Sequence, residues 1–185
     1  LTINNNIYLV NGSGGGFGFF NSADVTSLAA WKTAVGQDAG SYQSDPRLIN
    51  PGGATSVLNL HIDPSIGTIA EGNGFNIASV TDDFDGQTRS TLTPVDIGAD
   101  AGNFISVVKV ANALVGNGNY LTLSAAFAAI NAGAQTSANI LISIGANTNE
   151  PSAGAVLNHG VWTSMTIQPI GTGRTISANV TPGLP

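Results

Sequence analysis

Short apolar runs separated by polar, glycine-rich stretches constrain the fold of this chain more than any other feature. In the last third of the chain such runs occupy positions 140–144, 155–157, 165–167 and 175–177, with Asn, Gly, Thr and Pro abundant between them. Short strands with polar turns are typical of a sandwich, a barrel or a β-solenoid. A hairpin fold would join adjacent strands with two-residue Asn-Gly or Asp-Gly turns, and the gaps here are longer. The spacing therefore favours an all-β solenoid, with a β-sandwich as the alternative.

A helix is predicted over residues 123–132. Its apolar residues recur at spacings that share one helical face: Leu123, Ala126, Phe127 and Ile130. Thr122 can cap its first turn, and Gly133 can end its last. An apolar helix just before the first strand suits a solenoid, because an open solenoid end exposes apolar side chains and unpaired backbone groups. We therefore expect Leu123, Phe127 and Ile130 to cover such an end.

A shorter helix is predicted near 24–35. Ser22 or Asp24 could supply its N-cap, and Gly36 could stop it. Residues 57–62 alternate between apolar and polar side chains and predict a strand. A second apolar strand is expected within the otherwise flexible stretch 102–118.

The charge balance excludes several classes of function. The chain has 5 Lys and Arg against 11 Asp and Glu, a net charge of -6, and only 9% charged residues. Nucleic acids and anionic lipids both need basic surfaces, so neither partner is expected. Cysteine is absent, which excludes disulfides, zinc–thiolate sites and a cysteine nucleophile. The most apolar stretch, 104–115, is too short to span a membrane and contains Lys109 and Asn112.

Several motifs together resemble right-handed parallel β-helix domains of large secreted, repetitive surface proteins of Bacteroidetes-like bacteria. The predicted helix with its flanks, Tyr120–Gly133, resembles their N-terminal capping helix. Three segments after it resemble the first coils of such a domain: Ile140–Glu150, Met165–Gly171 and Arg174–Val180. Four segments in the first half resemble the last coils: Ser27–Pro51, Leu58–Gly72, Val80–Arg89 and Val95–Asp100. The order is circularly shifted, because the terminal coils come before the initial ones.

The resemblance implies an all-β dominated, right-handed parallel β-helix with a short capping α-helix. Residues 1–101 would form terminal coils, 102–118 a linker, and 119–185 the capping helix and first coils of the next unit. The strands near 1–10 and 174–180 would then lack partners within the chain, and an unpaired edge is a template for another chain. We therefore expect a structural, non-enzymatic subunit or tandem repeat of an extracellular bacterial filament that associates head-to-tail with copies of itself.

Two other functions stay open. A carbohydrate-binding adhesin module would need exposed aromatic side chains, for which Trp31 and Trp162 are candidates. A polysaccharide lyase or hydrolase would need acids facing a basic residue, or a pair of carboxylates such as Asp83 and Asp96. The resemblance assigns these acids to the closing turn of the domain, and we expect neither a catalytic site nor an organic cofactor.

One acidic group could hold a cation. It precedes Gly86 and consists of Asp82, Asp83 and Asp85. Oxygen ligands at alternate positions with a turn-forming Gly are typical of calcium loops, but Pro94 stands near the place where an EF-hand loop needs Glu. The structural interpretation is favoured, in which Arg89 pairs with at least one of Asp83, Asp85 and Asp96 and fixes the last turn.

Overall fold

The computed structural model describes residues 2–11, 16–92, 95–158 and 160–178, and the chain divides into two compact units. Unit 1 consists of residues 1–63 and 73–103, and unit 2 consists of residues 64–72 and 104–185. Pro94 of the expected calcium loop and residues 179–180 of the last expected strand lie outside the described residues. None of the helices within the described part of the chain has the length and apolar character needed to cross a bilayer.

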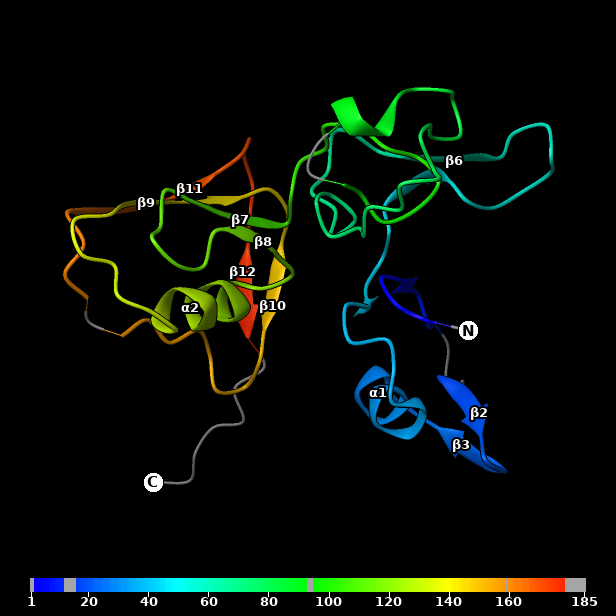
Figure 1. Ribbon diagram of the computed structural model, residues 1–185, viewed down its shortest axis with the longest axis horizontal. Coiled ribbons are helices and arrows are strands. Elements are labelled where there is room, and N and C mark those ends of the chain that lie inside the picture. Colours follow the sequence, from blue (N-terminus) through cyan, green and yellow to red (C-terminus); the bar gives the residue numbers. More distant parts are fainter. Residues whose placement is uncertain (1, 12–15, 93–94, 159, 179–185) are drawn as a thin grey trace. The chain divides into compact units, whose positions relative to one another are not determined.

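Unit 2 contains a four-stranded sheet in the order β11-β9-β7-β8 (Figure 1). Its strands are β7 (Val108–Ala111), β8 (Gly118–Tyr120), β9 (Asn139–Ile144) and β11 (Ser164–Pro169). β7 runs antiparallel to both β8 and β9, whereas β9 and β11 are parallel. A second, two-stranded sheet pairs β10 (Thr148–Glu150) with β12 (Ile176–Ala178), also in parallel. The strands β11 and β12 thus lie beside β9 and β10 in the same chain order.

The helix α2 (Leu123–Asn131) packs against β7, β8 and β10. Thr122 is its N-cap, as predicted, and accepts a hydrogen bond from the backbone N–H of Ala125. The predicted face is buried, with Leu123, Phe127 and Ile130 all less than a tenth exposed. The alternating residues Ile140, Ile142 and Ile144 of β9 are buried as well, so the apolar core of unit 2 draws on both the helix and the sheet. The helix ends at Asn131 with Ala132 as its C-cap, one residue before the predicted Gly133.

A segment from the first half of the sequence completes unit 2. Within residues 64–72, Thr68, Ile69 and Ala70 are fully buried. The backbone N–H of Thr68 donates to the carbonyl oxygen of Ile105 at 2.8 Å, and Thr68 forms a parallel bridge with Ser106. The buried Glu71 carboxylate accepts a hydrogen bond from the backbone N–H of Phe104. The apolar core of unit 2 therefore depends on residues that lie far from it in sequence.

The described residues of unit 1 form three small two-stranded sheets, one α-helix and one short 3-10 helix. Parallel β1 (Ile7–Tyr8) and β4 (Tyr42–Gln43) form the first sheet. Antiparallel hairpins form the other two, β2 (Gly18–Phe20) with β3 (Ala23–Val25) and β5 (Leu48–Asn50) with β6 (Asn59–Ile62). The N-cap of the helix α1 (Leu28–Val35) is Ser27, rather than the predicted Ser22 or Asp24. Its C-cap is Gly36, as predicted, and this glycine adopts the left-handed conformation that commonly ends a helix. A short 3-10 helix, η1, covers Arg89–Thr91.

A buried carboxylate organises the N-terminal part of unit 1. Asp38 is 1% exposed and accepts hydrogen bonds from four side chains, those of Asn6, Tyr8, Trp31 and Ser41. These donors come from the β1 region, α1 and the segment before β4. Within the described residues of this unit few apolar side chains are buried, namely Val25, Ile62, Ile97 and Ala101. Polar contacts therefore carry a larger share of its packing than they do in unit 2.

The prediction of a right-handed parallel β-helix is wrong. The described residues form five small sheets of mixed direction, and neither a solenoid nor the alternative β-sandwich is found among them. The antiparallel pairing of β7 with β8 and β9, together with the hairpins of unit 1, interrupts the uniform parallel stacking that a solenoid requires. The apolar run at 155–157 forms no strand, whereas the apolar strand expected within 102–118 is found as β7.

The terminal strands also differ from expectation. β1 pairs with β4, and β12 pairs with β10, so neither lacks a partner within the chain. Each of these strands belongs to a two-stranded sheet, and each therefore has a neighbour on one side only among the described strands. The expectation of wholly unpaired ends is replaced by ends with one open edge each.

Candidate functional site

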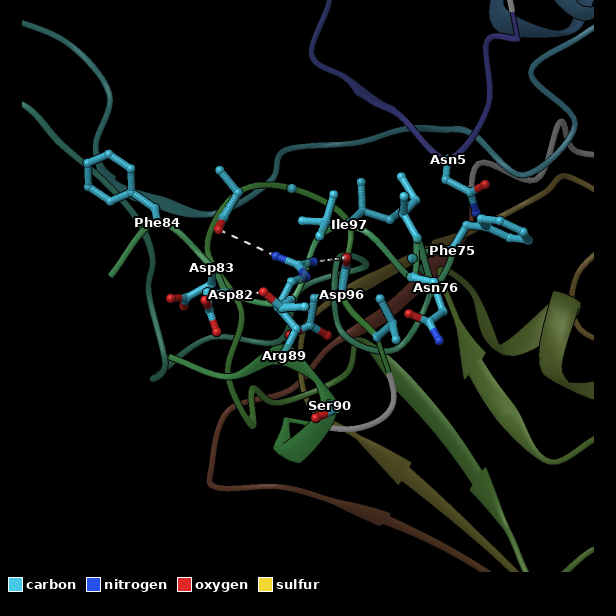
Figure 2. Close-up of a pocket in the computed structure, with 18 of the residues that line it drawn as sticks. Asn5, Phe75, Asn76, Asp82, Asp83, Phe84, Arg89, Ser90, Asp96 and Ile97 are labelled. Carbon is cyan, nitrogen blue, oxygen red and sulfur yellow. Dashed lines mark hydrogen bonds between the residues drawn. The ribbon is translucent and has the colours of Figure 1, made fainter. Parts of the chain in front are cut away.

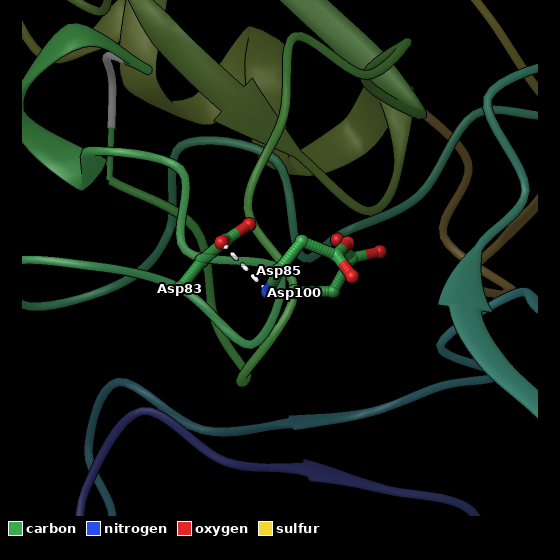
Figure 3. Close-up of side chains that lie close together, drawn as sticks. All are labelled: Asp83, Asp85 and Asp100. Atoms are coloured by element: carbon green, nitrogen blue, oxygen red, sulfur yellow. Dashed lines mark hydrogen bonds between the residues drawn. The ribbon is translucent and has the colours of Figure 1, made fainter.

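Three carboxylates from the loops of unit 1 lie close together. Asp83, Asp85 and Asp100 each offer an oxygen atom, and these atoms lie within 4.8 Å of one another (Figure 3). The sequence predicted Asp82 in place of Asp100. Asp82 instead forms an antiparallel bridge with Thr88, and its exposed carboxylate accepts a hydrogen bond from the Thr81 hydroxyl at 3.2 Å.

The Asp83 carboxylate is held by backbone N–H groups. One oxygen accepts from Asp85 at 2.9 Å and from Gln87 at 2.7 Å, and the other accepts from Ala101 at 3.3 Å. Burial would raise the pKa of Asp83, but the backbone hydrogen bonds and the nearby charge of Arg89 outweigh it and lower the pKa. Asp83 therefore stabilises the turn at residues 83–87 and links this turn to the segment around residue 101.

The other two carboxylates, Asp85 and Asp100, each bind a residue of β6. Asp85 lies 3.0 Å from the Nε2 atom of His61, whose Nδ1 atom lies 2.6 Å from the amide oxygen of Asn59. The hydrogen bond and the negative charge of Asp85 raise the pKa of His61. Asp100 accepts a hydrogen bond from the backbone N–H of Ile62 at 2.7 Å.

The cluster has the oxygen ligands that calcium prefers, but these oxygens already accept hydrogen bonds from backbone N–H groups or contact the His61 ring. A cation would compete with the backbone and imidazole donors just described. The arrangement fits the structural interpretation of the acidic motif better than a metal site, and the contacts link three stretches of unit 1.

Arg89 contacts backbone oxygens rather than carboxylates. Its guanidinium donates to the carbonyl oxygen of Asp96 at 3.0 Å and to that of Ala99 at 3.5 Å. Among the described residues, the ion pairs within 4.0 Å are Arg47 with Asp45 and His61 with Asp85. These contacts join Arg89 to main-chain carbonyls of the segment 96–99, and the positive charge of Arg89 also lowers the pKa of Asp83. The predicted pairing of Arg89 with a carboxylate of Asp83, Asp85 or Asp96 stays a prediction.

A cavity of about 1100 Å³ adjoins Arg89 within unit 1 (Figure 2). Its lining comes mostly from residues 74–99 and includes Phe75, Asp82, Phe84 and Asp96. Asp83 and Asp96, the carboxylate pair considered for a hydrolase, both line this cavity and both accept backbone hydrogen bonds, Asp83 as described and the 2% exposed Asp96 from the N–H of Gly102. The cavity could not be found from the sequence, because its lining belongs to loops without periodicity.

The two tryptophans do not form an exposed aromatic row. Trp31 donates its indole N–H to Asp38 and lies against the rings of Phe17 and Phe20. Trp162 lines a small pocket of about 230 Å³ in unit 2. Both side chains are only partly exposed, which removes the sequence-based argument for sugar stacking on them.

The edge strand β11 of unit 2 has exposed side chains on the sheet face that is buried in the neighbouring strand β9. Met165, Ile167 and Pro169 of β11 stand in register with Ile140, Ile142 and Ile144 of β9. In-register residues of parallel strands share one face of the sheet, so both sets face the same side. The β9 residues are at most 3% exposed, whereas Ile167 is 45% exposed. The sequence predicted the strands themselves, but not that this face would lie open.

Comparison of the chain with known proteins found no matching family, no matching curated protein and no matching solved structure.

Proposed function

We propose that the protein is a structural module of an extracellular bacterial filament or surface fibre, in which copies or repeats join by adding strands at the open edges of β11 and β12. The observation that supports this proposal is the uncovered apolar face of β11 beside the buried face of β9. Burying such a face against another strand layer removes apolar area from water and favours association. The extracellular setting is the part of the proposal that rests on the sequence resemblance alone.

The backbone of β11 offers donors on its outer side. The N–H groups of Ser164 and Ile170 donate to carbonyl oxygens on the β9 side, those of Ala138 and Ile144. Because backbone groups alternate in direction along a strand, those of Met165 and Ile167 point away from β9. Pro169 has no N–H and limits this edge to the residues before it.

The edge also lacks the charges that normally discourage strand addition. β11 and β12 read SMTIQP and ISA, and neither contains a charged residue. Edge strands of soluble proteins are commonly protected by Lys or other charged side chains. In β12, Ile176 is 49% exposed, so the apolar character of the edge extends to the second sheet.

Two variants at Ile167 test the proposal. Ile167→Lys places a charge on the open face, and Ile167→Pro removes one outward N–H while leaving the inward ones of β11 in place. We expect the unmodified chain to show a mass that rises with concentration above 18.6 kDa in sedimentation velocity, and both variants to reduce that rise. Val156→Lys, at a 63% exposed position outside the strands, is the matched control and should assemble like the unmodified chain.

Circular dichroism of each variant shows whether it is folded. A monomer at every concentration, or equal loss of assembly in the Val156→Lys control, would contradict the proposal.

A further inference from the structure

The cavity in unit 1 has the size and the mixed lining of a ligand site. Binding sites for small molecules commonly enclose roughly 300–1,000 Å³, and the volume of about 1100 Å³ is slightly above this range. All of its lining residues belong to unit 1. Figure 2 shows Arg89 between Phe84 on one side and Phe75 on the other.

Aromatic and aliphatic side chains in the lining are unusually exposed. Phe75 is 72% exposed, Phe84 is 76% exposed and Ile77 is 54% exposed. Side chains that line one hollow and stay exposed form an apolar surface of the kind that marks binding sites. The faces of the two phenylalanine rings can each pack against flat C–H surfaces of a ligand.

Polar groups of both kinds lie beside these rings. A guanidinium has five N–H donors, and the recorded bonds of Arg89 engage two of its nitrogens, which leaves donors for a ligand. The exposed Asp82 carboxylate and the Asn76 amide, both in the lining, add acceptors and donors. Asp82, Asp83 and Asp96 outnumber Arg89, so the charged groups of the lining sum to about -2 and disfavour an anionic ligand.

We propose that this cavity binds a neutral oligosaccharide, whose C–H faces pack on Phe75 and Phe84 and whose hydroxyl groups bond to Arg89 and Asp82. A neutral sugar matches the lining because each hydroxyl both donates and accepts, and because each ring has an apolar face. Nucleotides, sugar acids and other anions are disfavoured by the charge. This binding is independent of the proposed assembly, because the strands β11 and β12 belong to unit 2.

The test uses the full chain, labelled with ¹⁵N, and two neutral probes, cellohexaose and mannohexaose, with an oligogalacturonate hexamer as the anionic counterpart. We expect at least one neutral probe to shift amide resonances of residues 74–99, and the anionic probe to bind more weakly. Phe75→Ala should weaken binding about fivefold, as expected for the loss of one ring contact. Phe19→Ala removes a ring of similar exposure, 68%, outside the cavity and should leave affinity unchanged.

Arg89→Gln and Phe84→Ala extend the test to the other contacts. The amide spectrum of each variant without sugar reports whether unit 1 is still folded. Three results would each overturn the proposal: no shift with either neutral probe at millimolar concentration, stronger binding of the oligogalacturonate, or equal binding by the unmodified chain and folded Phe75→Ala and Phe84→Ala.

Discussion

At the scale of single residues, Asp38 shows how a carboxylate can organise a unit that buries few apolar side chains. Burial alone would raise its pKa, but hydrogen bonds from Ser41, Tyr8, Asn6 and Trp31 outweigh burial and lower the pKa to about 2. The partner Tyr8 has its pKa raised to about 12, first by burial and then by its contact with Asp38. Both shifts favour the pairing of an ionised Asp38 with a neutral Tyr8.

These shifts predict the pH range in which unit 1 is stable. Asp38 has a lowered pKa when folded, so its contribution is present above about pH 4 and is lost as the pH falls towards 2. Tyr8 has a raised pKa when folded, so its contribution is present below about pH 10 and is lost as the pH rises towards 12. The lowered pKa of Asp38 corresponds to a contribution of about 2 kcal/mol to the free energy of unfolding near neutral pH. Urea unfolding at a series of pH values, followed by Trp31 fluorescence, measures it.

Asp38→Asn should lower the stability of unit 1 at pH 7 and flatten its dependence on acid. Asp24→Asn is the control, because Asp24 is exposed on β3 and its carboxylate takes no part in this network. Unchanged acid sensitivity in Asp38→Asn would show that other carboxylates dominate the response.

At the scale of secondary-structure elements, α2 is capped from outside its own sequence. The buried Glu150, at the end of β10, accepts hydrogen bonds from the backbone N–H of Leu123 at 2.9 Å and of Ser124 at 2.7 Å. With Thr122, these bonds satisfy three of the N–H groups that a helix start leaves unpaired. The carboxylate also lies at the positive end of the helix dipole.

Glu150→Ala should therefore destabilise unit 2 by about 2 kcal/mol, because the buried N–H of Leu123 and the part-buried N–H of Ser124 lose their acceptor. Glu150→Gln keeps one acceptor oxygen and should cost less. The specific measurement is amide hydrogen exchange at Leu123 and Ser124, which should be accelerated more in the Glu150→Ala variant than in Glu150→Gln. Equal exchange in the unmodified chain and both variants would remove the capping role.

Phe127 tests the contact between α2 and the sheet. Its side chain is 7% exposed, on the helix that packs against β7, β8 and β10. Phe127→Ala should cost about 3–5 kcal/mol in the free energy of unfolding, measured by urea denaturation. Leu114→Ala truncates a side chain of the same unit that is 61% exposed and should change stability little. A loss below about 1 kcal/mol for Phe127→Ala would show that the core does not depend on this helix.

The sequence predicted some of these elements well and others poorly, for physical reasons. α2 has a cap and an apolar period within a few residues of each other, so local information was enough. The Glu150 cap, the Asp38 network and the addition of Asp100 to the acidic cluster join residues far apart in the chain, and no local pattern encodes such contacts. The solenoid prediction failed because short apolar runs specify strands but leave their direction open, as the antiparallel β7–β9 pair demonstrates.

At the scale of the whole molecule, the chain passes between its two units three times. It leaves unit 1 after Asp63, returns at Asn73, and leaves again after Asn103. The inserted segment 64–72 is the reason, because its buried residues belong to the core of unit 2. The units are therefore not two consecutive stretches of sequence, because a short segment of the first half of the chain is built into unit 2.

Ile69 gives the sharpest test of this arrangement. Its side chain is fully buried in unit 2, although the chain on both sides of the segment 64–72 belongs to unit 1. Ile69→Ala should cost about 3 kcal/mol, and the loss of protection in hydrogen exchange mass spectrometry should fall on peptides from 104–150. Ile97→Ala, at an 8% exposed position in unit 1, is the counterpart and should loosen peptides from 73–103 instead. If Ile69→Ala loosened residues 1–63 first, the segment 64–72 would have to be assigned to unit 1, and the core of unit 2 would have to be stable without it.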